Sequence, residues 1–184
     1  MTQLQQVHSG KPLANLSVDL DNEWAYLKTH GDPTWESYPS YLDVVVPRIL
    51  DVLAHRKLLI TVFVVGQDAA LEYNHSALAK IAEAGHEIGN HSLRHEPWLH
   101  LFSEQDLENE LAEAEKYIHA ATGKKPIGFR GPGYSQSPTM LQVLVRRGYA
   151  YDASSLPSFI GPLARAYYFA TGKLNPDKAA EVIK

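Results

Sequence analysis

The feature that most constrains the fold is the segment at residues 58–65, a run of eight residues in which only Thr61 is polar. The run is rich in β-branched residues and apolar on both faces, which is typical of a parallel strand covered on both sides. Gly66 ends the run. Because neighbouring parallel strands need long crossover connections, the rest of the chain must supply further strands and the helices between them.

The remaining sequence contains that alternation. Leu16, Val18 and Leu20 alternate with polar residues, which predicts a strand at 16–21. Serine caps and terminal glycines, together with apolar residues at helical spacing, indicate the helices. The predicted helices lie at residues 41–57, 76–84, 103–123 and 137–148, and the remaining strands lie at residues 86–89, 126–130 and 149–152.

The predicted order, β-α-β-α-β-α-β-α-β, implies an α/β fold with parallel strands and right-handed crossovers. An open doubly wound sheet and a barrel both fit this order. In either fold, functional side chains collect where the carboxyl ends of the strands meet.

Length and composition narrow the class of protein further. A chain of 184 residues predicts one domain, residues 1–184. A net charge of −4 without a basic stripe argues against a nucleic-acid partner, and the absence of cysteine excludes disulfides and cysteine-based sites. No apolar run reaches the length of a membrane span, and residues 1–10 lack the apolar region of a signal peptide. We therefore expect a cytoplasmic protein; its oligomeric state is not predicted.

Polar clusters follow four of the predicted strands. They comprise Asp19 with Asp21, His91 with His95, the segment from Arg130 to Tyr134, and Asp152. Because parallel strands end at one rim, these clusters are expected to meet. One carboxylate and two histidines form a known ligand set for zinc and other divalent metals. Such a metal lowers the pKa of a bound water to about 7, and a second carboxylate paired with an arginine is suited to accept the proton.

Two of these clusters also have simpler interpretations. Asp19 and Asp21 suit a solvated strand end, or calcium binding, although Trp24 stands where a calcium-binding EF-hand loop needs glycine. Arg130 suits a structural ion pair, and the glycines at 131 and 133 suit a turn. Because the clusters occur together at successive strand ends, we favour a functional site.

Three motifs together resemble the polysaccharide deacetylase (NodB-homology) family of carbohydrate esterases. Residues 17–21 read Ser-Val-Asp-Leu-Asp, a D-x-D variant of the family's first motif, usually Thr-Phe-Asp-Asp-Gly. Residues 91–95 read His-Ser-Leu-Arg-His and match the second motif fully. Residues 130–134 read Arg-Gly-Pro-Gly-Tyr, which is the Arg-x-Pro-aromatic motif with one extra glycine. The resemblance covers roughly residues 14–160.

The resemblance implies a distorted (β/α) barrel that hydrolyses N-acetyl groups on amino-sugar poly- or oligosaccharides. The metal, often zinc, would be held by Asp21, His91 and His95. Asp19 would be the general base and Arg130 would orient it. The backbone N–H near Tyr134 would help to stabilise the oxyanion, and the Tyr134 ring would wall the substrate groove. In the D-x-D variant the roles of the two aspartates could be exchanged, or Glu23 could take part.

One family feature is missing from the sequence. The late Leu-x-His motif supplies the general acid, but no histidine follows His119, and no closing strands are predicted. We expect that the chain is part of a longer protein; a general acid from elsewhere in the chain and impaired catalysis are the alternatives. Two alternative functions stay open: hydrolysis of cyclic amides or ureides, as in allantoinase-like relatives, and sugar binding without catalysis.

Overall fold

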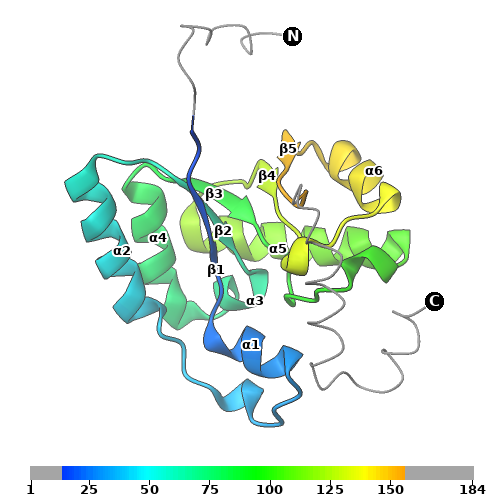
Figure 1. The fold of residues 1–184 in the computed structure, drawn as a ribbon, viewed down its shortest axis with the longest axis horizontal. Coiled ribbons are helices and arrows are strands. Elements are labelled where there is room, and N and C mark those ends of the chain that lie inside the picture. Colours follow the sequence, from blue (N-terminus) through cyan, green and yellow to red (C-terminus); the bar gives the residue numbers. More distant parts are fainter. Residues whose placement is uncertain (1–13, 156–184) are drawn as a thin grey trace, which may run out of the picture.

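The computed structural model describes residues 14–155, which contain a five-stranded parallel sheet (Figure 1). The strands are β1 (Ser17–Leu20), β2 (Thr61–Val64), β3 (Glu87–Asn90), β4 (Gly128–Phe129) and β5 (Tyr151–Asp152). Their order in the sheet, β1-β2-β3-β4-β5, is their order in the sequence. A doubly wound sheet reverses its order at a switch point, whereas a barrel wall does not. The sheet is therefore a partial barrel wall, which confirms the barrel prediction.

Helices connect the strands, and α2 and α4 lie side by side against the sheet (Figure 1). The helices are α1 (Glu23–Thr29), α2 (Leu42–Arg56), α3 (Gly66–Ala69), α4 (His75–Glu83), α5 (Glu104–Thr122) and α6 (Pro138–Arg147). Short 3-10 turns lie at η1 (Trp35–Ser37), η2 (Glu72–Asn74), η3 (Leu99–Leu101) and η4 (Pro132–Tyr134). Among the residues that the structure describes, no helix is both long and apolar enough to cross a lipid bilayer.

The predicted helix ends are confirmed for α5 and α6. Ser103 Oγ accepts a hydrogen bond from the backbone N–H of Asp106, and Ser137 Oγ accepts one from Met140. Helix α1 was not predicted, because seven residues carry too little periodicity and an isolated helix of that length is marginal. Its stability comes from packing, since Trp24 and Ala25 are buried.

The strand predicted at residues 58–65 is shorter in the structure. Strand β2 begins at Thr61, and Leu58 and Leu59 are 44% and 71% exposed. The reason is the end of α2: Lys57 adopts a left-handed conformation, and the Leu58 N–H donates to the Leu53 carbonyl. Leu58 therefore closes the end of the helix, and Leu59 lies between the helix and the strand, although both are apolar enough for a strand.

The two faces of the sheet have different compositions. Leu20, Val62 and Ile88 lie in one apolar core cluster with residues of the surrounding helices. Asp19, Phe63 and Gly89, which pair in register, alternate with these residues and face the other side. The alternation places polar functional groups on the inner face of the barrel wall. The C-terminal segments of the predicted domain lie outside the described residues.

Candidate metal centre

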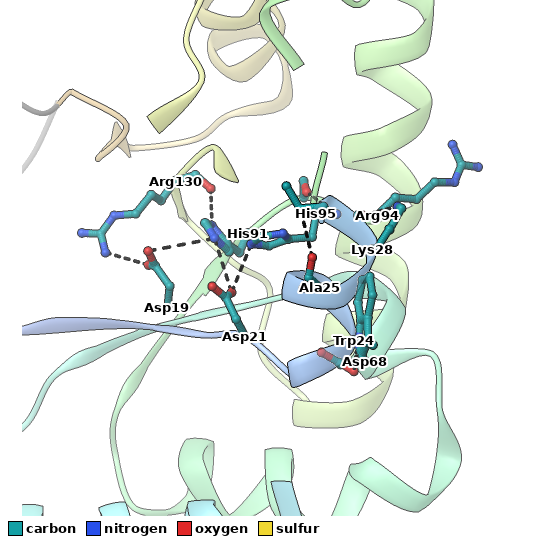
Figure 2. Close-up of polar contacts among 12 residues, drawn as sticks. Asp19, Asp21, Trp24, Ala25, Lys28, Asp68, His91, Arg94, His95 and Arg130 are labelled. Atoms are coloured by element: carbon teal, nitrogen blue, oxygen red, sulfur yellow. Dashed lines mark hydrogen bonds and ion pairs between the residues drawn. The ribbon is translucent and has the colours of Figure 1, made fainter. Parts of the chain in front are cut away.

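The ends of β1 and β3 bring together one carboxylate and two imidazoles (Figure 2). Asp21 directly follows β1, and His91 directly follows β3. Asp21 Oδ1 lies 3.5 Å from His91 Nε2 and 3.4 Å from His95 Nε2. One ligand atom from each of the three side chains lies within 4.8 Å of the others. These three side chains are the metal ligands that the family resemblance implies.

The two separations measured from Asp21 fit a tetrahedral metal ion. Bonds of about 2.0–2.1 Å to zinc place neighbouring ligand atoms about 3.3–3.4 Å apart, close to both separations measured from Asp21. Asp21 Oδ1 is buried, and within the described part of the chain no hydrogen bond reaches it. A buried carboxylate oxygen without a partner is costly, and a bound cation would remove that cost.

The protonation state of His91 also suits a metal ligand. Its Nδ1 lies 2.6 Å from the carbonyl oxygen of Arg130, which can only accept a hydrogen bond. Nδ1 therefore carries the proton, and the lone pair of Nε2 faces Asp21. Burial, followed by the nearby His95, lowers the pKa of His91 below its ordinary value, so the ring is neutral near pH 7. Metal-binding histidines commonly have such an outer hydrogen bond.

Asp21 is ionised in this setting. Burial by itself raises the pKa of the carboxyl group, but the close approach of the His95 imidazole, and then that of His91, lowers the pKa below its ordinary value. An anionic oxygen and a neutral imidazole are the forms in which these groups bind a divalent metal.

Asp19 lies beside this cluster and is oriented by Arg130. The guanidinium Nη1 lies 2.7 Å from Asp19 Oδ1, and Nη2 donates to Ser17 Oγ at 2.7 Å. The other oxygen of Asp19, Oδ2, lies 4.0 Å from His91 Nε2. Arg130 thus contacts the cluster twice, through its side chain to Asp19 and through its carbonyl to His91 (Figure 2).

An aromatic ring supports the arginine, and no sequence pattern indicates it. The Arg130 guanidinium carbon lies 4.3 Å from the centroid of the Phe63 ring. Phe63 lies against Gly89 on the next strand, where an added Cβ would come within 2.4 Å of the ring. Only glycine at position 89 leaves this space. The apolar run predicts Phe63 as a core residue, and its contact with Arg130 depends on strand register.

The other predicted residues lie around this centre. Tyr134 ends η4 with a φ of +55°, its side chain is 40% exposed, and its N–H donates to the Gly131 carbonyl at 2.9 Å. That N–H is engaged within the turn, and its oxyanion role stays a prediction. Asp152 accepts hydrogen bonds from the N–H and hydroxyl of Ser154, whose hydroxyl in turn accepts from the Gly131 N–H. Asp152 therefore supports the turn after Arg130. Glu23 is exposed in the first turn of α1.

The loop at residues 91–95, which we call the metal-binding loop, is held from one side by Glu110 of α5. Glu110 is 2% exposed, and its Oε1 accepts the N–H groups of Leu93 at 3.0 Å and Arg94 at 2.7 Å. The loop contains two residues with positive φ, Ser92 and His95, at +65° and +54°. Such conformations persist when surrounding contacts enforce them, and Glu110 supplies two of these contacts.

Lys28 of α1 holds the same loop from another direction. Its ammonium group donates to the Arg94 carbonyl at 2.8 Å and forms an ion pair with Glu96 at 2.8 Å. The N–H and carbonyl of Arg94 are therefore bound by side chains of opposite charge. Neither Lys28 nor Glu110 was predicted, because each acts through backbone groups distant in the sequence.

We expect Glu110→Ala to weaken metal binding about 10–100-fold, as loss of an outer support of a metal ligand commonly does. The change leaves two backbone donors without their acceptor, so the free energy of unfolding should also fall by about 2–4 kcal/mol. Glu110→Gln keeps an acceptor oxygen and should therefore retain most of the metal affinity and most of the free energy of unfolding. Zinc titration and chemical denaturation measure these effects.

Glu115→Ala on the same helix is the matched control. It breaks a bidentate ion pair with Arg147, with separations of 2.9 and 2.7 Å, away from the metal-binding loop. It should lower stability without changing metal affinity. Equal metal affinity in wild-type protein and Glu110→Ala would show that Glu110 supports only the fold.

One protein-family profile matches most of this chain. Residues 33–151 match the sequence profile described as polysaccharide deacetylase. The matched range contains His91, His95 and Arg130 and begins after Asp19 and Asp21. Because the match covers more than half of the chain, the chain belongs to the polysaccharide deacetylase family.

Two curated relatives show how far the similarity extends. A peptidoglycan deacetylase of Helicobacter pylori is 28% identical over 167 residues, which is 87% of this chain and 54% of the relative. A chitooligosaccharide deacetylase of Sinorhizobium fredii is 33% identical over 78 residues, covering 42% of this chain and 35% of that protein. The chain spans about half of the length of the Helicobacter relative.

Solved structures share the fold. A protein of Mycobacterium smegmatis described as a polysaccharide deacetylase superposes with a TM-score of 0.65 at 27% identity, covering 75% of this chain and 49% of its own. A family 4 acetyl xylan esterase of Clostridium thermocellum, solved with a cobalt ion, gives a TM-score of 0.52 at 28% identity, with coverages of 58% and 50%. The barrel is therefore of the family 4 carbohydrate esterase type.

Proposed function

We propose that the protein is a zinc-dependent hydrolase that removes N-acetyl groups from amino-sugar poly- or oligosaccharides. The observation that carries the proposal is the convergence of Asp21, His91 and His95 beside the ion pair of Asp19 with Arg130. A metal site alone would suit many functions. A second, separately oriented carboxylate next to the site adds the base that a hydrolase needs.

Each residue of the centre would have its own role. Asp21, His91 and His95 would hold the metal, which when bound supplies a Lewis acid for the acetamide carbonyl and for water. Asp19 would accept the proton of the attacking water through Oδ2, the oxygen that faces the cluster. Arg130 would keep Asp19 oriented through Oδ1. The 40% exposed Tyr134 ring would border the groove in which the sugar lies.

The substrate class is supported by the names of the relatives. One is a peptidoglycan deacetylase and another a chitooligosaccharide deacetylase. Zinc is favoured because two nitrogens and one carboxylate oxygen, with open positions, form a catalytic zinc set. A metal in this fold is also supported by the family 4 acetyl xylan esterase, whose structure was solved in complex with a cobalt ion.

The test is a substrate comparison with zinc-loaded protein. We expect acetate release from N-acetylated chitooligosaccharides or peptidoglycan fragments, and no ring opening of cyclic amides such as allantoin. Acetate is measured by an enzyme-coupled assay, and ring opening by loss of ultraviolet absorbance. Ring opening without acetate release would replace the proposal with a cyclic amide hydrolase, and sugar binding without either reaction would indicate a non-catalytic module.

A further inference from the structure

A cavity of about 210 Å³ lies next to the metal centre. One of its lining residues, Asn22, directly follows the proposed ligand Asp21. Another, Gln67, donates its backbone N–H to the carbonyl of Leu93 in the metal-binding loop at 2.8 Å. The cavity is therefore joined to the metal centre on two sides, through the segment after β1 and through α3.

Four aromatic residues line the cavity: Trp24, Trp35, Tyr38 and Tyr73. The Trp24 and Trp35 rings pack with centroids 5.7 Å apart, and Trp24 is almost fully buried. Tyr38 and Tyr73 are 40% and 64% exposed. The aromatic rings are therefore buried at one side of the cavity and exposed to solvent at the other. Such a surface suits a partly apolar ligand that enters from solvent.

A buried polar network fixes the inner part of this wall. Asp68 is fully buried and lines the cavity, and its Oδ1 accepts hydrogen bonds from Trp24 Nε1 at 2.8 Å and Asn22 Nδ2 at 3.0 Å. Its second oxygen, Oδ2, has no hydrogen-bond partner within the described residues. The inner part of the wall is thus preorganised before a ligand binds.

The charge of the lining narrows the ligand class. Glu36 and Asp68 are the charged residues of the lining, and neither lysine nor arginine contributes to it. An anionic ligand such as a phosphate or uronate is therefore disfavoured. The half-buried Gln67 adds an amide that both donates and accepts hydrogen bonds. The cavity volume is smaller than the roughly 300–1,000 Å³ that is typical of sites for drug-sized ligands. A cavity of this size suits a ligand with a single ring.

We propose that this cavity binds a neutral pyranose unit of the substrate chain, adjacent to the unit whose acetamide lies at the metal centre. This inference rests on the proposed function. The apolar face of the pyranose packs against Trp35 and Tyr38, while its hydroxyl groups form hydrogen bonds with the Gln67 amide. The protein consequently prefers oligosaccharides to single sugars.

The test measures binding without requiring turnover. The probe is the β-1,4-linked glucose tetramer, which has no acetamide and cannot be deacetylated, titrated into the zinc-loaded full chain by calorimetry. We expect Trp35→Ala and Gln67→Leu each to raise the Kd of the tetramer about tenfold or more, a loss of about 1.4 kcal/mol. Glucose should bind too weakly to measure in all variants.

Tyr26→Ala is the matched control, because Tyr26 is an exposed aromatic residue on α1 that does not line the cavity. It should leave the Kd of the tetramer unchanged. If Trp35→Ala prevents folding, Tyr38→Ala replaces it, since Tyr38 is 40% exposed and contributes less to the core. Absence of tetramer binding, or equal Kd values in all variants, would overturn the subsite. Failure of acetate release with tetramer binding intact would overturn the proposed function and leave the subsite standing.

Discussion

Replacing His91 with alanine is expected to abolish stoichiometric zinc binding and to lower the affinity for zinc by more than about 100-fold. Loss of an outer-shell partner alone reaches about 10–100-fold, and His91 is a proposed direct ligand. Its Nε2 is 3.5 Å from Asp21 Oδ1, and its ring is oriented by the Arg130 carbonyl. Metal analysis of purified protein and competition with a chromogenic chelator measure the effect.

The control for this change is His86→Ala. His86 is also a buried histidine, 6% exposed, and it precedes β3, away from the rim where the proposed ligands meet. Both changes remove a buried imidazole, so both should destabilise the fold. Only His91→Ala should remove the metal. If the two variants and the wild-type protein hold equal amounts of zinc, the ligand assignment is wrong.

The second large effect is expected for Asp19→Asn, which should lower turnover about 10²–10⁴-fold, the usual contribution of a general base. Metal binding should persist. The asparagine carbonyl can still accept the hydrogen bond that Arg130 donates to Asp19 Oδ1, so the local geometry is kept while the proton acceptor is lost. Acetate release and zinc titration of the same preparation separate the two effects.

Asp51→Asn removes the same charge from an exposed position on α2 and should leave both measurements unchanged. A variant Asp19→Asn that retains turnover would exclude Asp19 as the base. A variant that loses its metal as well would indicate that Asp19, rather than Asp21, is the carboxylate ligand of this D-x-D motif.

Much of the architecture was predictable because it depends on local patterns. Alternating apolar residues mark β1, and serine caps with terminal glycines mark α5 and α6. The strand predicted at 58–65 is too long because hydrophobicity cannot tell a strand from the turn that ends a helix. Helix α1 was missed because its stability comes from tertiary packing around Trp24 rather than from its own periodicity.

The supporting residues of the site were not predictable. Glu110 and Lys28 bind backbone groups of the metal-binding loop across 16 and 66 positions of sequence, and Phe63 contacts Arg130 from another strand. A backbone N–H or carbonyl is present at almost every position, so no residue type in the loop reveals its partner. Only the fold brings these groups within reach.

The sequence by itself determined the parallel α/β class and the strand ends at which Asp19, Asp21, His91 and Arg130 occur, since hydrophobic period and strand direction are encoded locally. The tertiary structure decided that the strand order is that of a barrel. It also decided that Asp21 Oδ1 faces both histidines, and that Arg130 contacts Asp19 and His91 together. These outcomes depend on strand neighbours and side-chain directions across a sheet, which arise only when distant segments pack.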